Sequence, residues 1–276
     1  MGTSKSSTGS PSNVPMVPPW APEPVAPAGA SETSPPQPVP NTPQPPNVLI
    51  APARRFGAAR TSLGSFAKTG SAADMRRGIG HYARKGIGGG SVAAQRMGAT
   101  ARTGGALYGA LSGLASGQTN ALASGEDRNS LQGRSVEQII TAIVESVRPV
   151  DGTQDAETAR DALQGALSAD LLDQYPNADL LNLSEEERLF IVERYTALDV
   201  FNQLELNVGK AIQNNAPNIT TYLSRLREVK NYVKQTVAAR FREIRKAGAS
   251  LNPRTVAGIV RQAIQQTFEV FGEAEE

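Results

Sequence analysis

Apolar residues recur at steps of three and four through the second half of the chain, which is the spacing of amphipathic helices. These stripes occupy five stretches, at about 135–148, 155–174, 184–208, 218–244 and 252–271. No segment alternates apolar and polar residues with a period of two over a useful length, so strands are not expected. The pattern predicts an all-α fold with a C-terminal bundle of about five helices.

Short polar signals mark where several of these helices begin and end. Ser135 is followed three positions later by Gln138, and Ser184 by Glu187, which are capping-box patterns. Asn218 and the pair Asn252-Pro253 stand in front of the last two stripes, where a side-chain oxygen can cap a new helix. We therefore assign residues 135–276 to a helical bundle domain.

The first part of the chain has a different composition. Fifteen of the 19 prolines fall within residues 1–52, among Ser, Thr, Gly and Ala. With so little apolar surface to bury, the ordering entropy is not offset, and the sequence predicts a disordered tail over residues 1–52. The first residues lack the apolar run of a secretory signal peptide, so a cytoplasmic location is expected.

Glycine dominates the two segments that follow. Residues 53–104 form a basic Gly-rich segment, in which we expect only short helices, around Ala73–Tyr82 and Ser91–Met97, because each glycine costs a helix roughly 1 kcal/mol. Residues 105–134 are predicted to be a small-residue helix and linker, since glycine recurs every fourth position from Gly105 to Gly117. In lipid this stripe would be a dimerisation face, but the continuous small or apolar stretch is only about ten residues, against the roughly 20 that a span needs. We expect a packing helix and no membrane segment.

Charge is distributed unevenly. The net charge is −1 over residues 1–50 (one Lys, two Glu), +9 over 51–134 (twelve Lys/Arg, three acids) and −6 over 135–276 (fifteen against twenty-one). The basic middle is suited to a polyanion, an acidic partner or the acidic C-terminal part of the same chain, and the sequence does not choose among these. With Phe56, Phe66 and Tyr82 nearby for base stacking, nucleic-acid binding is one hypothesis, and a solvated or partner-covered basic linker is the other. The candidate contact residues are Arg54, Arg55, Arg60, Arg76, Arg77, Arg84 and Lys85.

Catalytic chemistry has little support in the composition. The chain has no Cys and one His, which excludes a disulfide scaffold, a thiolate metal site and a cysteine nucleophile, and makes a His-based metal site or triad hard to build. No phosphate-binding loop motif is present, and Gly78-Ile79-Gly80 follows no strand, as a dinucleotide fingerprint requires. We expect a protein that is not an enzyme, with no catalytic residues, no metal and no cofactor.

The amino terminus offers a different kind of site. Removal of Met1 would expose the amine of Gly2, and Met1-Gly2 with Ser6 also satisfies the N-myristoylation pattern. A terminus on a long disordered tail can enter the active site of another protein without unfolding anything. An inert tail is the alternative.

Strings along nearly the whole chain resemble the QatB family of the bacterial Qat anti-phage defence system. They are Met1-Gly2-Thr3-Ser4, Val17-Pro18-Pro19-Trp20, Arg54-Arg55-Phe56, Gly104-Gly105-Ala106-Leu107-Tyr108 and Arg148-Pro149-Val150-Asp151-Gly152-Thr153. These strings are typical of a family and are not diagnostic of a reaction.

The resemblance implies partners and a role. The partners would be a QatC-like protein similar to QueC, a QatA-like ATPase and a QatD-like TatD nuclease. QueC-like proteins of defence systems are associated with attaching a deazaguanine nucleobase to an N-terminal glycine. The resemblance thus implies Gly2 as modification acceptor, with Thr3 and Ser4 read by the modifying enzyme, and Trp20 is a candidate anchor within a stiff proline-rich stretch. The chain would then be adaptor and protein substrate. The alternative is a nucleic-acid-binding subunit that acts through residues 54–102.

Overall fold

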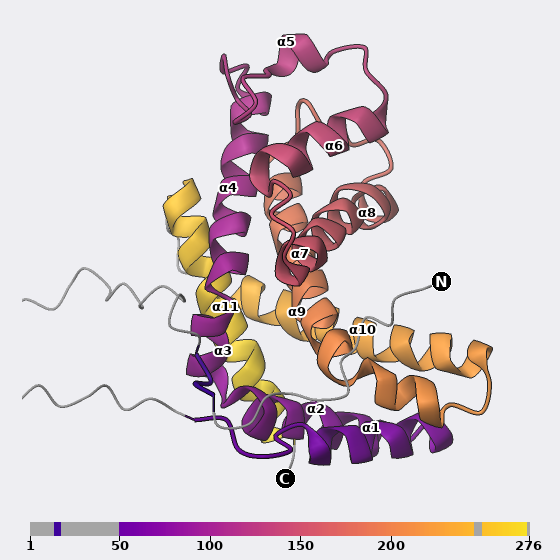
Figure 1. Ribbon diagram of the computed structural model, residues 1–276. Coiled ribbons are helices and arrows are strands. Elements are labelled where there is room, and N and C mark those ends of the chain that lie inside the picture. Colours follow the sequence, from indigo (N-terminus) through magenta and orange to yellow (C-terminus); the bar gives the residue numbers. More distant parts are fainter. Residues whose placement is uncertain (1–13, 18–49, 246–249, 275–276) are drawn as a thin grey trace, which may run out of the picture.

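The computed structural model describes residues 14–17, 50–245 and 250–274 (Figure 1). These residues form helices and one isolated β-bridge, between Pro15 and Ile50, and no strand occurs among them. The predicted all-α fold is confirmed.

The first half of the described chain is more helical than its glycine content predicts. The helices at Ala72–His81 and Gly90–Arg96 agree with the two expected short helices, but a third, at Gly57–Thr69, was not expected. Its Gly64 lies against the side chain of Asn215, so tertiary packing offsets the cost of glycine there. The elements are α1 (Gly57–Thr69), α2 (Ala72–His81), the π-helix η1 (Tyr82–Ile87), α3 (Gly90–Arg96), α4 (Gly98–Ala115) and α5 (Arg128–Leu131). Helix α4 crosses the boundary between the 53–104 and 105–134 segments.

The second half contains the five helical stretches that the apolar stripes predict. They are α6 (Val136–Val147), the continuous run of α7 (Gln154–Gly165), the π-helix η2 (Ala166–Asp170) and α8 (Leu171–Gln174), then α9 (Glu185–Asn215), α10 (Ile219–Arg245) and α11 (Pro253–Glu273). Capping boxes at Ser135 and Ser184 are formed as expected, and Asn252 caps α11 as expected, there within a capping box with Thr255. Asn218 accepts a hydrogen bond from the amide of Thr221 at 2.8 Å and so caps α10.

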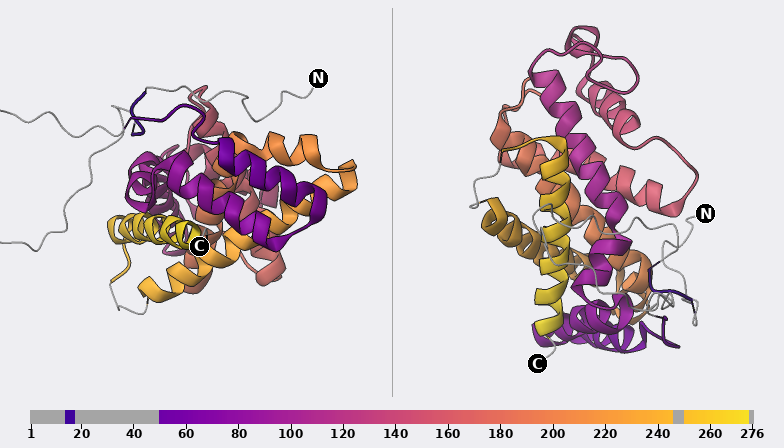
Figure 2. Two further views of the ribbon diagram at one scale, coloured as in Figure 1. Left: turned by 90° about the horizontal axis from the view of Figure 1, so that it is seen from below. Right: turned by 90° about the vertical axis from the view of Figure 1, so that its left-hand side faces the viewer.

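Helices α4 and α11 run antiparallel and in close contact (Figures 1 and 2). A Cβ on Gly105 would lie 2.4 Å from the main-chain oxygen of Pro253, and one on Gly104 would lie 3.0 Å from Val260. Only glycine allows the two backbones to approach this closely. The small-residue stripe is therefore a helix-packing surface within the protein.

Helix α9 is the central element, with α4, α7, α10 and α1 packed around it (Figure 1). Its buried positions lie on all sides, because a helix surrounded by neighbours needs an apolar surface all round. Aromatic rings of η1 and α11 also belong to the core. The ring centroids of Tyr82 and Phe268 lie 6.1 Å apart. Side chains from the 53–104 segment and from the 135–276 segment thus belong to one hydrophobic cluster.

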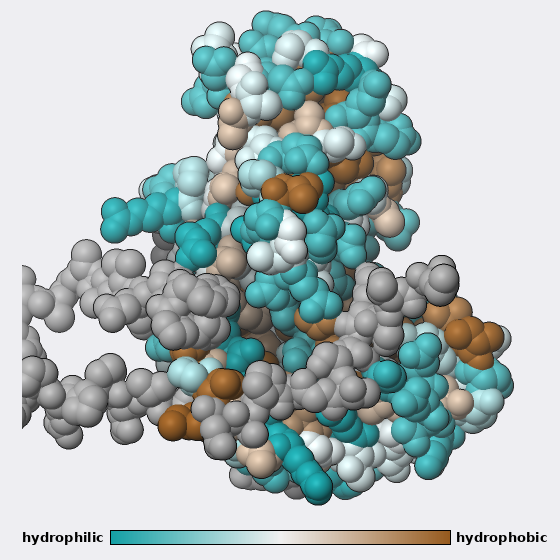
Figure 3. All heavy atoms as spheres, in the orientation of Figure 1, coloured by the Kyte–Doolittle hydropathy of each residue, from teal (hydrophilic) through white to brown (hydrophobic). Residues whose placement is uncertain are grey.

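The visible surface is mainly polar (Figure 3). Apolar atoms gather at its right-hand edge, where Figure 1 places the turn between α9 and α10, and Ile219 (65% exposed) and Leu223 (54% exposed) begin α10 there. Among the described residues, no helix combines the length and the hydropathy needed to cross a membrane.

Candidate functional site

The residues predicted to act at the amino terminus, Gly2, Thr3, Ser4 and Trp20, lie outside the described residues. Within the same segment, however, Val14–Val17 are described. They are packed on the folded helices, although the composition predicts disorder over the whole of 1–52.

Val14–Val17 are held by main-chain and apolar contacts. The amide of Ala51 donates to the main-chain oxygen of Val14 at 2.8 Å, next to the bridge between Pro15 and Ile50. Met16, buried to 95%, packs against Ala51 and Val92. Arg96 of α3 donates through Nη1 to the main-chain oxygen of Met16 at 2.6 Å. We call Val14–Val17 the anchor segment.

The basic residues named from the sequence do not form one surface. Arg55 is only 9% exposed and its guanidinium lies 4.9 Å from the centre of the Phe56 ring. Burial, and then the nearby charge of Arg96, lower the pKa of Arg55. Arg60 donates to the main-chain oxygen of Asn207 at 3.0 and 3.3 Å, so it ties α1 to α9.

The other basic candidates are exposed. Arg54 lies just before α1 in a left-handed conformation (φ +54°). Four more lie on α2 and η1, which form one continuous helical run, and Arg77 is paired there with Asp74 at 3.0 Å. The exposed cations of this run are Arg76, Arg77, Arg84 and Lys85.

A polar cavity of about 250 Å³ lies beside the anchor segment, between α3, α4, α7 and α9. Arg96 takes part in both, since it lines the cavity and binds Met16. The walls combine two acids, two arginines, polar side chains and two aromatic rings. The described lining residues are Tyr82, Ile87, Arg96, Met97, Ala99, Thr100, Thr103, Arg148, Asp155, Ala159, Asp199, Gln203, Asn207 and Phe268.

Asp199 is the most unusual group in this cavity. Only 3% of the residue is exposed, and its Oδ2 accepts a hydrogen bond from the Thr100 hydroxyl at 2.6 Å. Its Oδ1 is buried without a hydrogen-bond partner among the described residues. Burial raises the pKa of Asp199 to about 6, against the opposing effects of the Thr100 hydrogen bond and of Arg148. The carboxyl group therefore titrates close to neutral pH.

Other parts of the cavity wall are basic and aromatic. Tyr82, 1% exposed, is stacked on Phe56 with ring centroids 5.6 Å apart, and its hydroxyl oxygen is buried. Burial raises the pKa of Tyr82, while the charges of Arg96 and Arg55 act in the opposite direction. The cavity wall thus carries an acidic group at Asp199 and a basic group at Arg96.

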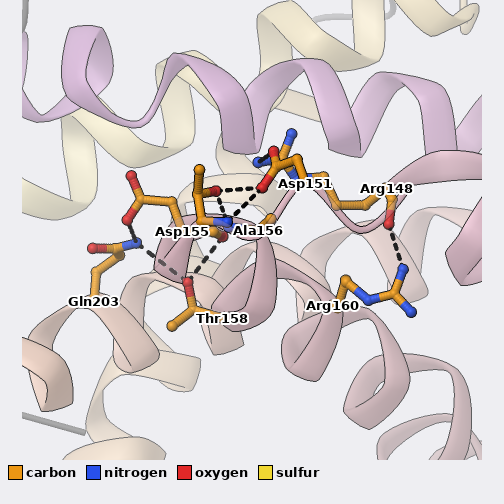
Figure 4. A network of polar contacts seen from close by, with 8 residues as sticks. Arg148, Asp151, Asp155, Ala156, Thr158, Arg160 and Gln203 are labelled. Carbon is orange, nitrogen blue, oxygen red and sulfur yellow. Dashed lines mark hydrogen bonds and ion pairs between the residues drawn. The ribbon is translucent and has the colours of Figure 1, made fainter.

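Arg148, which lines the cavity, begins the loop between α6 and α7, and Figure 4 shows the polar contacts of this loop. Asp151 accepts hydrogen bonds from the amide and the hydroxyl of Thr153, at 2.9 and 2.5 Å, and lies 3.3 Å from Nη2 of Arg148. Arg160 donates to the main-chain oxygen of Arg148 at 2.7 Å. These contacts order the loop Arg148–Thr153 and hold Arg148 at the cavity wall.

The amide of Gln203 joins α9 to the start of α7, next to this loop. It donates to Asp155 at 3.3 Å and faces the Thr158 hydroxyl at 3.5 Å (Figure 4). These contacts keep the Asp155 carboxylate at the rim of the cavity, where it is exposed.

Sequence reasoning did not find this site. One available signal was Asp199 itself, a charged residue four positions after Tyr195 inside the apolar stripe of α9. A charge at a core position requires partners, and those of Asp199, Thr100 and Arg148, come from two other parts of the sequence. Their convergence is a property of the fold and has no local pattern.

The fold and the site define an all-α protein with an interior polar cavity next to an anchored N-terminal segment. The family model described as "Qat anti-phage system associated protein QatB" matches residues 88–271. The match covers more than half of the chain, and the chain belongs to the QatB family, whose members are components of the Qat anti-phage defence system. All described lining residues except Tyr82 and Ile87 lie within the matched range. No curated protein and no solved structure is significantly similar to the chain.

Proposed function

We propose that the chain is a non-enzymatic adaptor of the Qat system and a protein substrate whose Gly2 receives a deazaguanine-type nucleobase from a QueC-like partner. The anchor segment carries this proposal. It attaches the chain to the helical body at Val14, twelve residues after Gly2. Twelve extended residues reach at most about 40 Å, so the terminus stays close to the body and can still enter a partner's active site.

In this proposal the partner supplies the chemistry. A conjugation at Gly2 needs a free α-amine on the substrate and an activated nucleobase held by the modifying enzyme. The helical body then provides the surfaces that bind the other Qat components, of which the QatC-like protein is the first candidate, followed by the QatA-like ATPase and the QatD-like nuclease.

Mass spectrometry of the intact protein and of its N-terminal peptide tests the proposal. The chain is expressed alone, together with its genomic neighbours, and with the neighbours after inactivation of the QueC-like protein. We expect a mass increase on the Gly2 peptide only when the active partner is present, and loss of phage defence in Gly2→Ala. Ser10→Ala, which lies in the same segment but away from the terminus, is the matched control. An unmodified Gly2 in active, defending cells would contradict the proposal.

A second function has support from one observation. Arg76, Arg77, Arg84 and Lys85 are exposed along the α2–η1 run and could contact phosphates. If this run binds nucleic acid, affinity should fall steeply with salt, and Arg76→Ala with Arg77→Ala should weaken it. Arg254→Ala, an exposed arginine at the start of α11, should leave it unchanged. Equal affinity in all three proteins would exclude this surface as the binding site.

A further inference from the structure

One buried carboxylate oxygen of the cavity wall lacks a hydrogen-bond donor among the described residues. Oδ2 of Asp199 is occupied by Thr100, but Oδ1 has no partner among the described residues and is buried. A buried carboxylate oxygen without a donor costs free energy, so a ligand that brings a donor to this point is favoured.

The charges around Asp199 favour a cationic donor. The groups that face it are Asp155 from α7, Arg148 from the α6–α7 loop and Tyr195 from α9 itself. Arg148 also lies 3.3 Å from Asp151, so its charge is shared between carboxylates. Asp199 and Asp155 together therefore carry more negative charge than Arg148 can balance.

We propose that this cavity binds a protonated primary amine, with Asp199 as its acceptor and Asp155 as a second carboxylate at the rim. A volume of about 250 Å³ is small beside pockets for drug-sized ligands and suits an amine on a short, unbranched group. Arg96 also lines the cavity, and its Nη1 already donates to the main-chain oxygen of Met16.

Two sources can supply such an amine. One is the chain's own terminus, because the anchor segment is bonded to Arg96, a residue of the cavity wall. Residues 2–13 carry an α-amine and Lys5 and no acid, so their charge complements Asp199 and Asp155. The other source is a free small amine. Binding of the unmodified terminus does not require the conjugation proposed above. If that conjugation forms an amide, it would remove the charge of Gly2 and release the terminus, a consequence that rests on the proposed function.

The reactivity of the Gly2 amine distinguishes the two sources. The full chain, expressed alone and with Met1 removed as checked by intact mass, is labelled with trace acetic anhydride, and Lys68 serves as the exposed internal reference. If the terminus occupies the cavity, Gly2 should be labelled about tenfold faster in Asp199→Asn than in the wild type. Asp173→Asn, an exposed acid of α8, should match the wild type. Asp155→Asn, whose side chain is exposed and whose folding is less at risk, should give a smaller increase.

Glycinamide is the probe for a free amine. Added to the wild type, it should speed the labelling of Gly2 by competition if the terminus is the ligand. If a free amine is the ligand, Gly2 should react equally in all variants, while glycinamide raises the melting temperature of the wild type and not of Asp199→Asn or Asp155→Asn. Equal labelling together with no effect of glycinamide on any variant would overturn the proposal. The labelling is done without any partner protein, so a negative result would not bear on the modification of Gly2. That modification is tested separately by the mass spectrometry described above.

Discussion

At the scale of single residues, glycine has two opposite effects on the helices of this protein. At Gly105 the absent side chain makes room for the main chain of Pro253. At Gly258, an exposed position of α11, a Cβ would meet nothing within 4 Å. The same residue type therefore stabilises one helix contact and weakens the helix elsewhere.

A pair of glycine substitutions tests this difference. Gly105→Ala should destabilise the protein by about 1–3 kcal/mol, because α4 and α11 must move apart. Gly258→Ala should be neutral or stabilise it by about 0.5–1 kcal/mol through helix propensity. Urea unfolding followed by circular dichroism measures both. Equal effects of the two substitutions would show that the α4–α11 contact tolerates a methyl group.

The sequence predicts the glycine stripe as a packing surface but does not identify what packs on it. Pro253 lies far along the chain from Gly105, and no local pattern connects the two. The cavity shows the same limit more strongly. Asp199 interrupts an apolar stripe, which is visible, but the pairing of its carboxylate with Thr100 follows only from the crossing of α4 and α9.

At the scale of elements, the starts of the C-terminal helices were the best predicted feature. Ser135, Ser184 and Asn252 act through atoms within three residues, so their capping boxes are readable from the chain. Helix α1 and the anchor segment were not predicted. Both depend on distant contacts, of Gly64 with Asn215 and of Met16 with Val92, which composition does not contain.

The anchor segment can be tested through one amide. Met16→Asp would place a charge in the contact with Ala51 and Val92 and should detach the segment. The Ala51 amide, which donates to Val14, should then exchange with deuterium about tenfold faster. Met16→Leu keeps the volume and apolar character and should exchange like the wild type. Unchanged exchange in Met16→Asp would mean that the segment is held by its main chain alone.

At the scale of the whole molecule, helices of the basic Gly-rich segment and of the C-terminal bundle share one hydrophobic cluster. Leu63 of α1 is fully buried in it, together with Val260 of α11. The two segments differ in composition and in charge, yet their apolar side chains are buried in the same core. We therefore expect the described helices to unfold together.

Leu63→Ala tests this cooperativity. Loss of a buried leucine should cost about 2–5 kcal/mol and lower the melting temperature in one transition. Deuterium exchange of the slowest amides of α11 should accelerate to the same extent, although α11 is at the other end of the chain. Leu172→Ala, an exposed leucine of α8, should change neither quantity. Faster exchange confined to α1 and α2 would show that these helices open independently of α11.

The bridge between Pro15 and Ile50 has a consequence for how relatives of this protein can differ in length. It brings residue 15 and residue 50 together on the body, so the chain between them is closed into a loop whose closure costs entropy. Doubling the length of such a loop costs only about 0.6 kcal/mol. The closure entropy alone therefore puts little constraint on the length of chain between these points. The reach of Gly2 is set by the twelve residues before the anchor and is independent of the proline-rich stretch that follows it.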